Sequence, residues 1–194
     1  RKIRAEITTD DIDFNIQRLG LWLKYNQKSA ISKTEWESLA IASKPKLKGE
    51  LFVGVKYGHD GQHVAMSVAS KTNEGKIFVE ALDCRTIREG NDWILSYIAE
   101  MKPKTVVVDG ANGQHILEKD MKDAKMKAPT LPTVKEIIGA NATFEQGLFK
   151  GNICHSNQAS LTQSVSNSEK RAIGSNGGFG YRSLKEGVEI ALLD

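Results

Sequence analysis

Short apolar runs separated by turn residues fill the chain between residues 51 and 83. Such runs predict strands. The tetrapeptide Gly58-His59-Asp60-Gly61 predicts a tight turn after the first strand, and a polar turn containing Asn73 and Gly75 follows the second. The predicted strands cover residues 51–57, 62–70 and 76–83. Consecutive strands joined in this way form an antiparallel meander.

The pattern then changes to a helical period over residues 92–101, which Pro103 terminates. The next run, residues 105–108, is continuously apolar and β-branched, which is typical of a strand covered on both faces. It leads directly into Asp109. Further helices are predicted around 112–124, 134–147, 157–167 and 184–194, a short fifth strand within 129–132, and a glycine-rich turn over 174–180 between two short extended pieces.

Residues 1–50 have a different character. Ile16, Leu19 and Trp22 recur at helical spacing, which predicts a docking helix. Ser32 with Glu35 three residues later forms a capping-box pattern, so a second short helix is expected there. A lysine-rich stretch, residues 44–49, predicts a linker. We therefore expect a connector over 1–50 and a compact domain over 51–194.

This order of elements predicts an α/β fold of the ribonuclease H-like type. Its mixed sheet would combine the three-strand antiparallel meander with parallel strands, flanked by helices. Actin-like ATPases and sugar kinases begin with the same order, so the choice between phosphodiester cleavage and phosphotransfer depends on the site residues.

Composition narrows the class of protein only slightly. A chain of 194 residues with 40% hydrophobic residues suits one domain, and no apolar stretch approaches the roughly 20 residues of a membrane span. Cys84 and Cys154 lie far apart, so we expect small buried thiols in a reducing compartment. The net charge of +3 carries little weight. Lysines crowd residues 44–56 and 119–127, which would suit either a phosphate backbone or an ordinary solvated surface.

Phosphodiester cleavage by two divalent ions requires several converging carboxylates, because hard cations take oxygen ligands. Asp109 is the first candidate metal ligand, since the carboxyl end of a strand opens onto the crevice where α/β sheets bind ligands. The alternative is that it caps the following helix. Asp194 is the second candidate, because it follows the helical stripe of Gly187, Ile190 and Ala191. The alternative there is a solvated chain end.

The first strand departs from this pattern. Ribonuclease H-like nucleases normally carry an aspartate in its middle or at its end, and Lys56 stands at that position. Asp60, four residues later, could reach the same pocket as a metal ligand or could equally be a turn former.

His155 is expected at the start of a helix, where an imidazole could contact phosphate or a metal-bound water. A structural histidine is the favoured alternative. No local signature supports nucleophilic catalysis by a Ser-His-Asp or Cys-His arrangement.

Taken together, these residues resemble the C-terminal nuclease domain of the large terminase subunit of tailed bacteriophages. The resemblance covers most of the chain. It is carried by the order and spacing of several short segments: Asp13-Phe14-Asn15-Ile16 with Leu19 and Trp22, Val53-Gly54-Val55 with Asp60-Gly61, Val107-Val108-Asp109-Gly110, His155 with Gln158 and Leu161, Asn167, and Ile190-Ala191-Leu192-Leu193-Asp194.

The resemblance implies an endonuclease dependent on Mg²⁺ or Mn²⁺ that cleaves double-stranded DNA concatemers during genome packaging in the host cytoplasm. Asp109 and Asp194 match the family's acids, with Asp60 as a third possible ligand, whereas Lys56 departs from the first-strand acid. An ATPase domain would precede residues 1–50, the chain would stop inside a longer helix, and the small terminase subunit and the portal protein would be partners. A DNA-docking module of the packaging motor with a degenerate nuclease site is the alternative.

Overall fold

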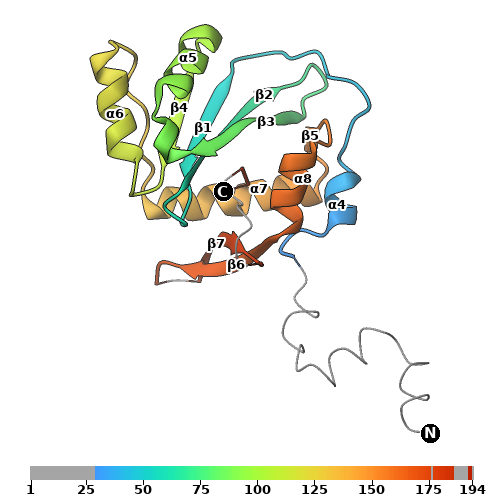
Figure 1. Ribbon diagram of the computed structural model, residues 1–194. Coiled ribbons are helices and arrows are strands. Elements are labelled where there is room, and N and C mark those ends of the chain that lie inside the picture. Colours follow the sequence, from blue (N-terminus) through green and yellow to red (C-terminus); the bar gives the residue numbers. More distant parts are fainter. Residues whose placement is uncertain (1–28, 176, 186–191, 194) are drawn as a thin grey trace, which may run out of the picture.

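The computed structural model describes residues 29–175, 177–185 and 192–193. Its elements follow one another along the chain as shown in Figure 1. They are α4 (Lys33–Glu37), β1 (Phe52–Tyr57), β2 (His63–Lys71), β3 (Ile77–Thr86), the short 3-10 helix η1 (Ile87–Glu89), α5 (Asp92–Met101), β4 (Thr105–Asp109), α6 (Gln114–Asp123), α7 (Val134–Phe149), β5 (Ile153–His155), α8 (Ala159–Ser166), β6 (Ser168–Ile173) and β7 (Gly178–Ser183).

A five-stranded mixed sheet forms the centre of the fold, in the order β4-β1-β2-β3-β5. Strands β1, β2 and β3 form the predicted antiparallel meander, β4 runs parallel to β1, and β5 runs parallel to β3. The fold class predicted from the sequence is therefore confirmed. The expected fifth strand near residue 130 is reduced to one parallel bridge between Thr130 and Val107 at the outer edge of β4.

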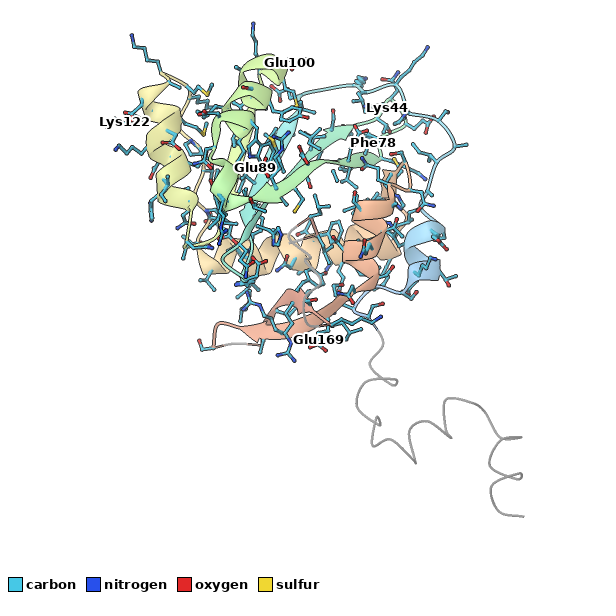
Figure 2. The ribbon with its side chains drawn as sticks, in the orientation of Figure 1. Lys44, Phe78, Glu89, Glu100, Lys122 and Glu169 are labelled. Carbon is cyan, nitrogen blue, oxygen red and sulfur yellow. The ribbon has the colours of Figure 1, made fainter. Side chains whose placement is uncertain are left out.

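The two faces of the sheet bury two separate cores. Alternating residues of β1, Val53, Val55 and Tyr57, pack with β2, β4, α5 and α6 into the first core. The second core joins β3 and β5 to α4, α7 and α8, with Trp36 of α4 among its buried members. Figure 1 shows α5 and α6 on one side of the sheet and α7 on the other. Polar side chains such as Glu100 and Lys122 project outward from α5 and α6 (Figure 2).

Two predicted features of local structure are wrong. Strand β4 is not covered on both faces, because Val106 and Val108 are buried while Val107, facing the other way, is 37% exposed. His155 does not begin a helix. It ends β5, whose three residues are all buried and pair with Ile77, Phe78 and Val79 of β3, and α8 starts only at Ala159.

Several local predictions are confirmed. Ser32 and Glu35 form the complete capping box at the start of α4. The glycine-rich turn joins β6 to β7 as an antiparallel hairpin. Of the two cysteines, Cys154 is buried as predicted, whereas Cys84 is half-buried. No helix within the described part of the chain has the length and apolar character to cross a membrane.

Some predictions fall outside the described residues. These are the docking helix with Ile16, Leu19 and Trp22, the candidate ligand Asp194, and most of the C-terminal helix. Of that last segment four residues are described: Leu184 and Lys185 lie in a bend, and Leu192 and Leu193 lie in a turn.

Candidate active site

Lys56 and Asp109 form an ion pair at the carboxyl ends of β1 and β4. Because the two strands are parallel, their carboxyl ends meet at one edge of the sheet, and the register pairs these two residues directly. The Lys56 Nζ atom lies 2.5 Å from Asp109 Oδ2. The lysine side chain is only 9% exposed and that of the aspartate 26%. The basic residue in β1 therefore lies directly opposite the candidate metal ligand in β4.

The alternation of side chains along the strands directs this pair toward α7. Val55 and Val108 point into the core on the α5 and α6 side, so their neighbours Lys56 and Asp109 point to the opposite face. A cavity of about 390 Å³ lies there, lined also by Ser67 of β2 and by residues of α7. The pair thus stands at the wall of a cavity between the sheet and α7.

The loop after Asp109 is packed tightly on the residue after Lys56. Gly110 has a φ of +107°, a region that favours glycine, and a Cβ atom there would lie 2.6 Å from Tyr57 Cβ and closer still to the Tyr57 carbonyl oxygen. A Cβ atom on Gly113 would overlap the Tyr57 ring. Tyr57 itself donates its hydroxyl to Asn91 Oδ1 at 2.7 Å, and burial raises the pKa of this phenol above its ordinary value. This packing fixes the ends of β1 and β4 relative to each other.

The carboxylate of Asp60 organises the hairpin turn. Its Oδ1 accepts the backbone N–H groups of Gln62 and His63 at 2.8 and 3.1 Å, and its Oδ2 lies 2.5 Å from His63 Nδ1. Asp60 lines a second hollow of about 680 Å³ together with Lys56 and Asp109. Asp60 therefore shares a hollow with Asp109 while its oxygens are engaged in the turn.

Arg171 of β6 brings a second cationic group to this hollow. Its Nη2 lies 2.6 Å from His59 Nε2, and its Nε donates to the carbonyl oxygen of Tyr181 at 3.1 Å. Asn112, from the loop after β4, lines the same hollow. No pattern in the sequence points to Arg171, because only the tertiary placement of the β6–β7 hairpin brings it next to Lys56 and Asp109. Guanidinium and amide donors around a hollow suit the oxygens of a phosphate backbone.

His155 stacks on Trp36 of the second core and is not among the residues lining either hollow. It is 1% exposed, its Nε2 lies 2.8 Å from the Trp36 carbonyl oxygen, and its Nδ1 accepts the Asn157 N–H at 3.0 Å. Burial lowers the pKa of this imidazole. The structure therefore separates His155 from Lys56, Asp60 and Asp109.

Glu136 is the other carboxylate around the 390 Å³ cavity. It accepts the backbone N–H and the hydroxyl of Thr133 at 2.7 and 2.8 Å, which completes the capping box of α7. These hydrogen bonds lower the pKa of the carboxyl. The Glu136 carboxylate is engaged in capping α7, as the Asp60 carboxylate is engaged in the hairpin turn.

The described residues supply too few ligands for a centre of two divalent cations. A centre that holds two divalent cations needs several carboxylates between them, because each hard cation takes about six oxygen ligands. Within residues 29–175, 177–185 and 192–193, no three His, Cys, Asp or Glu side chains are grouped so that they could hold a metal ion. The carboxylate best placed for one, Asp109, carries the Lys56 ammonium on Oδ2. The described residues therefore do not fit a two-ion centre.

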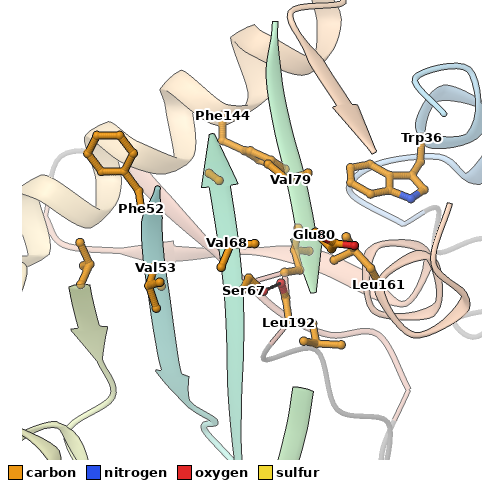
Figure 3. Close-up of a pocket in the computed structure, with 14 residues that line it drawn as sticks. Trp36, Phe52, Val53, Ser67, Val68, Val79, Glu80, Phe144, Leu161 and Leu192 are labelled. Atoms are coloured by element: carbon orange, nitrogen blue, oxygen red, sulfur yellow. Dashed lines mark hydrogen bonds between the residues drawn. The ribbon is translucent and has the colours of Figure 1, made fainter. Parts of the chain in front are cut away.

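A third cavity, of about 290 Å³, lies further along the same face of the sheet and is mostly apolar. Figure 3 shows Trp36 of α4 beside Val79 of β3 in its lining, together with Phe144 of α7. Ser67 donates a hydrogen bond to the Leu192 carbonyl oxygen at 3.4 Å. Its lining offers few polar groups to a phosphate. The chemistry-bearing residues are those around Lys56 and Asp109.

The fold and this site can be compared with known proteins. No sequence family and no curated protein matches the chain. Among solved structures, the HK97 bacteriophage large terminase superposes with a TM-score of 0.65 at 16% identity, covering 84% of this chain and 41% of the terminase. The large terminase nuclease from thermophilic phage G20c gives a TM-score of 0.57 at 13% identity, covering 86% of this chain and 95% of the nuclease.

Structures of the nuclease domain of the large terminase subunit of bacterial virus Sf6 also match, with TM-scores of 0.54 at 14% identity for one that contains manganese. The G20c nuclease has likewise been solved with bound magnesium. The chain thus has the ribonuclease H-like fold of terminase nucleases, and it spans less than half of the HK97 protein but most of the length of the separate nuclease domains.

Proposed function

We propose that the chain is the nuclease domain of a phage-type large terminase and hydrolyses phosphodiester bonds of double-stranded DNA. The observation that carries this proposal is the place of Asp109, at the carboxyl end of β4, within a fold shared with terminase nucleases along most of its length. Ligands of α/β sheets bind at this edge. Arg171 and Asn112 line the hollow beside Asp109, where they would hold the DNA backbone.

The substrate, the partners and the cation are proposed from the resemblance to terminase nucleases. The substrate would be a concatemer of phage genomes in the host cytoplasm, and the partners an ATPase domain of the same full-length protein, the small terminase subunit and the portal protein. The cation would be Mg²⁺ or Mn²⁺, with Asp109 as one ligand. Asp194 is proposed as a second ligand, and Asp60 would join them only by giving up its turn contacts.

Plasmid cleavage tests the proposal. The chain is incubated with supercoiled DNA and increasing Mn²⁺ or Mg²⁺, and compared with Asp109→Ala and with Asp123→Ala, which removes an exposed carboxylate at the end of α6. We expect nicked and linear products from the wild type and from Asp123→Ala, and none from Asp109→Ala. Absence of cleavage by the wild type at every metal concentration, or undiminished cleavage by Asp109→Ala, would refute the nuclease assignment.

The second candidate function is a DNA-docking module of a packaging motor with a degenerate cleavage site. The ion pair of Lys56 with Asp109 favours it, because a basic residue stands where ribonuclease H-like nucleases normally carry an acid. This alternative predicts DNA binding in EDTA that weakens as salt rises, without cleavage. Binding that is insensitive to salt would count against it.

A further inference from the structure

Lys56 is buried against Asp109, the candidate metal ligand, and its charge affects the binding of a cation there. The Lys56 side chain is 9% exposed and its Nζ lies 2.5 Å from Asp109 Oδ2. An ammonium group loses hydration on burial and is stabilised by a carboxylate at this distance. Asp109 is therefore neutralised by a cation that belongs to the protein.

The lysine is held in this position by the sheet. It lies between β2 and β4, with Ala65 and Asp109 as its register partners. Tyr57, the next residue, is buried and is clamped by Gly110 and Gly113. This packing fixes the backbone, and the burial of the side chain with its ion pair to Asp109 places the ammonium at the crevice wall.

The other described carboxylates around the two hollows, Asp60 and Glu136, have oxygens engaged in local hydrogen bonds. Asp60 accepts two backbone N–H groups and contacts His63, and Glu136 accepts the backbone N–H and the hydroxyl of Thr133. A divalent cation approaching Asp109 would meet a repulsive ammonium and would have to compete with it for Oδ2.

We propose that Lys56 is a built-in cation of the nuclease centre: its ammonium occupies Asp109 Oδ2, so that divalent ions bind weakly and in smaller number than at a centre with an acid in β1. This inference rests on the proposed function for its biological setting. The Lys56 ammonium and a divalent ion compete for the same carboxylate, that of Asp109.

Mn²⁺ binding to the DNA-free protein, followed by calorimetry and by the electron paramagnetic resonance of the free ion, tests this competition. We expect Lys56→Ala to bind Mn²⁺ about tenfold or more tightly than wild type, since removing a like charge next to the ion is favourable. Lys56→Asp is expected to bind it more tightly still and to raise the number of bound ions. Lys44→Ala is the matched control. Lys44 forms an exposed ion pair with Glu80 at 2.8 Å, away from the site beside Phe78 (Figure 2), and its loss should leave Mn²⁺ binding unchanged.

A double-mutant cycle keeps the test independent of how well the Lys56 variants fold. In the wild-type background, Asp109→Asn should lower the Mn²⁺ affinity by a smaller factor than in Lys56→Ala, because the ammonium competes with the ion for this carboxylate. In the Lys56→Ala background, the same change should abolish the gained affinity. An equal loss on Asp109→Asn in the two backgrounds, or equal Mn²⁺ affinities of wild type and a folded Lys56→Ala, would overturn the proposal.

The Mn²⁺-binding test and the plasmid-cleavage test can fail independently of each other. Failure of plasmid cleavage refutes the nuclease assignment and leaves the ion-binding cycle valid. Failure of the cycle, with cleavage intact, refutes only the role of Lys56.

Discussion

The indole of Trp36 stacks on the imidazole of His155, with the ring centroids 3.8 Å apart and the planes 8° from parallel. The backbone carbonyl oxygen of the same tryptophan lies 2.8 Å from His155 Nε2. Ala40 forms an isolated parallel β-bridge with His155. The segment that precedes β1 is therefore attached to β5 through one buried histidine. This arrangement gives His155 a structural role.

Replacement of His155 by phenylalanine should destabilise the protein without changing its chemistry. The ring is kept, but the Trp36 carbonyl oxygen and the Asn157 N–H lose their partner, which costs about 1–3 kcal/mol. Urea unfolding measures the loss. His115→Phe, on the exposed surface of α6, is the control and should stay within about 0.5 kcal/mol of wild type. A drop in DNA cleavage by His155→Phe at full stability would instead indicate a catalytic role.

The same pair predicts a pH dependence of stability. Burial lowers the pKa of His155 below its ordinary value of 6.5, so between these two pKa values the unfolded chain binds a proton that the folded chain does not. The contribution of the neutral imidazole to stability is therefore complete above pH 6.5 and decreases as the pH falls toward the lowered pKa. We expect the difference in unfolding free energy between wild type and His155→Phe to be smaller at pH 5 than at pH 8. A difference that is constant over this range would contradict the assignment of a neutral, buried histidine.

Much of the fold could be predicted from the sequence, because its signals are local. The helical period over 92–101 defined α5 with its observed bounds, and the β-branched run ending at Asp109 defined β4. Strand β5 was missed because three residues carry no period, and they become a strand only by pairing with β3. The covering of β4 was overestimated because a run of valines does not reveal which face remains open.

The site could be predicted only where strand ends define it. Lys56 and Asp109 lie at the ends of two strands that the sequence predicts, and the parallel pairing of β1 and β4 brings them into contact. Arg171 could not be found in this way. It lies 62 residues beyond Asp109 in the sequence, and only the packing of the hairpin on the end of the sheet brings it to the hollow. The turn contacts of Asp60 likewise depend on the positions of the N–H groups of Gln62 and His63.

Gly110→Ala should disturb the site, and Gly75→Ala provides the matched comparison. Both glycines have positive φ, +107° and +88°, so an alanine is strained at either position by about 1–2 kcal/mol. Only at Gly110 would the new methyl group overlap Tyr57, which adds about 1–3 kcal/mol, whereas nothing lies within 4 Å at Gly75. Thermal unfolding should therefore show the larger loss for Gly110→Ala, and this variant should also lose nuclease activity because Asp109 is displaced. Equal losses at both positions would show that the contact with Tyr57 is unimportant.

Arg171→Ala should weaken DNA binding through the loss of one phosphate contact. The guanidinium lines the same hollow as Lys56 and Asp109, and its contacts to His59 Nε2 and the Tyr181 carbonyl oxygen orient it there. If it contacts one backbone phosphate, its removal should reduce the slope of log affinity against log salt by about 1, whatever the DNA sequence.

Fluorescence anisotropy in EDTA over a range of salt concentrations measures that slope without cleavage. Arg182→Ala is the control, because Arg182 lies on the same hairpin, pairs with Glu169 at 2.6 Å and does not line the hollow. The two variants remove the same charge from the same element, so any difference between them reports the position of the charge. An equal decrease for both would mean that the hairpin attracts DNA only through its overall charge, and no decrease for Arg171→Ala would place the DNA backbone elsewhere on the molecule.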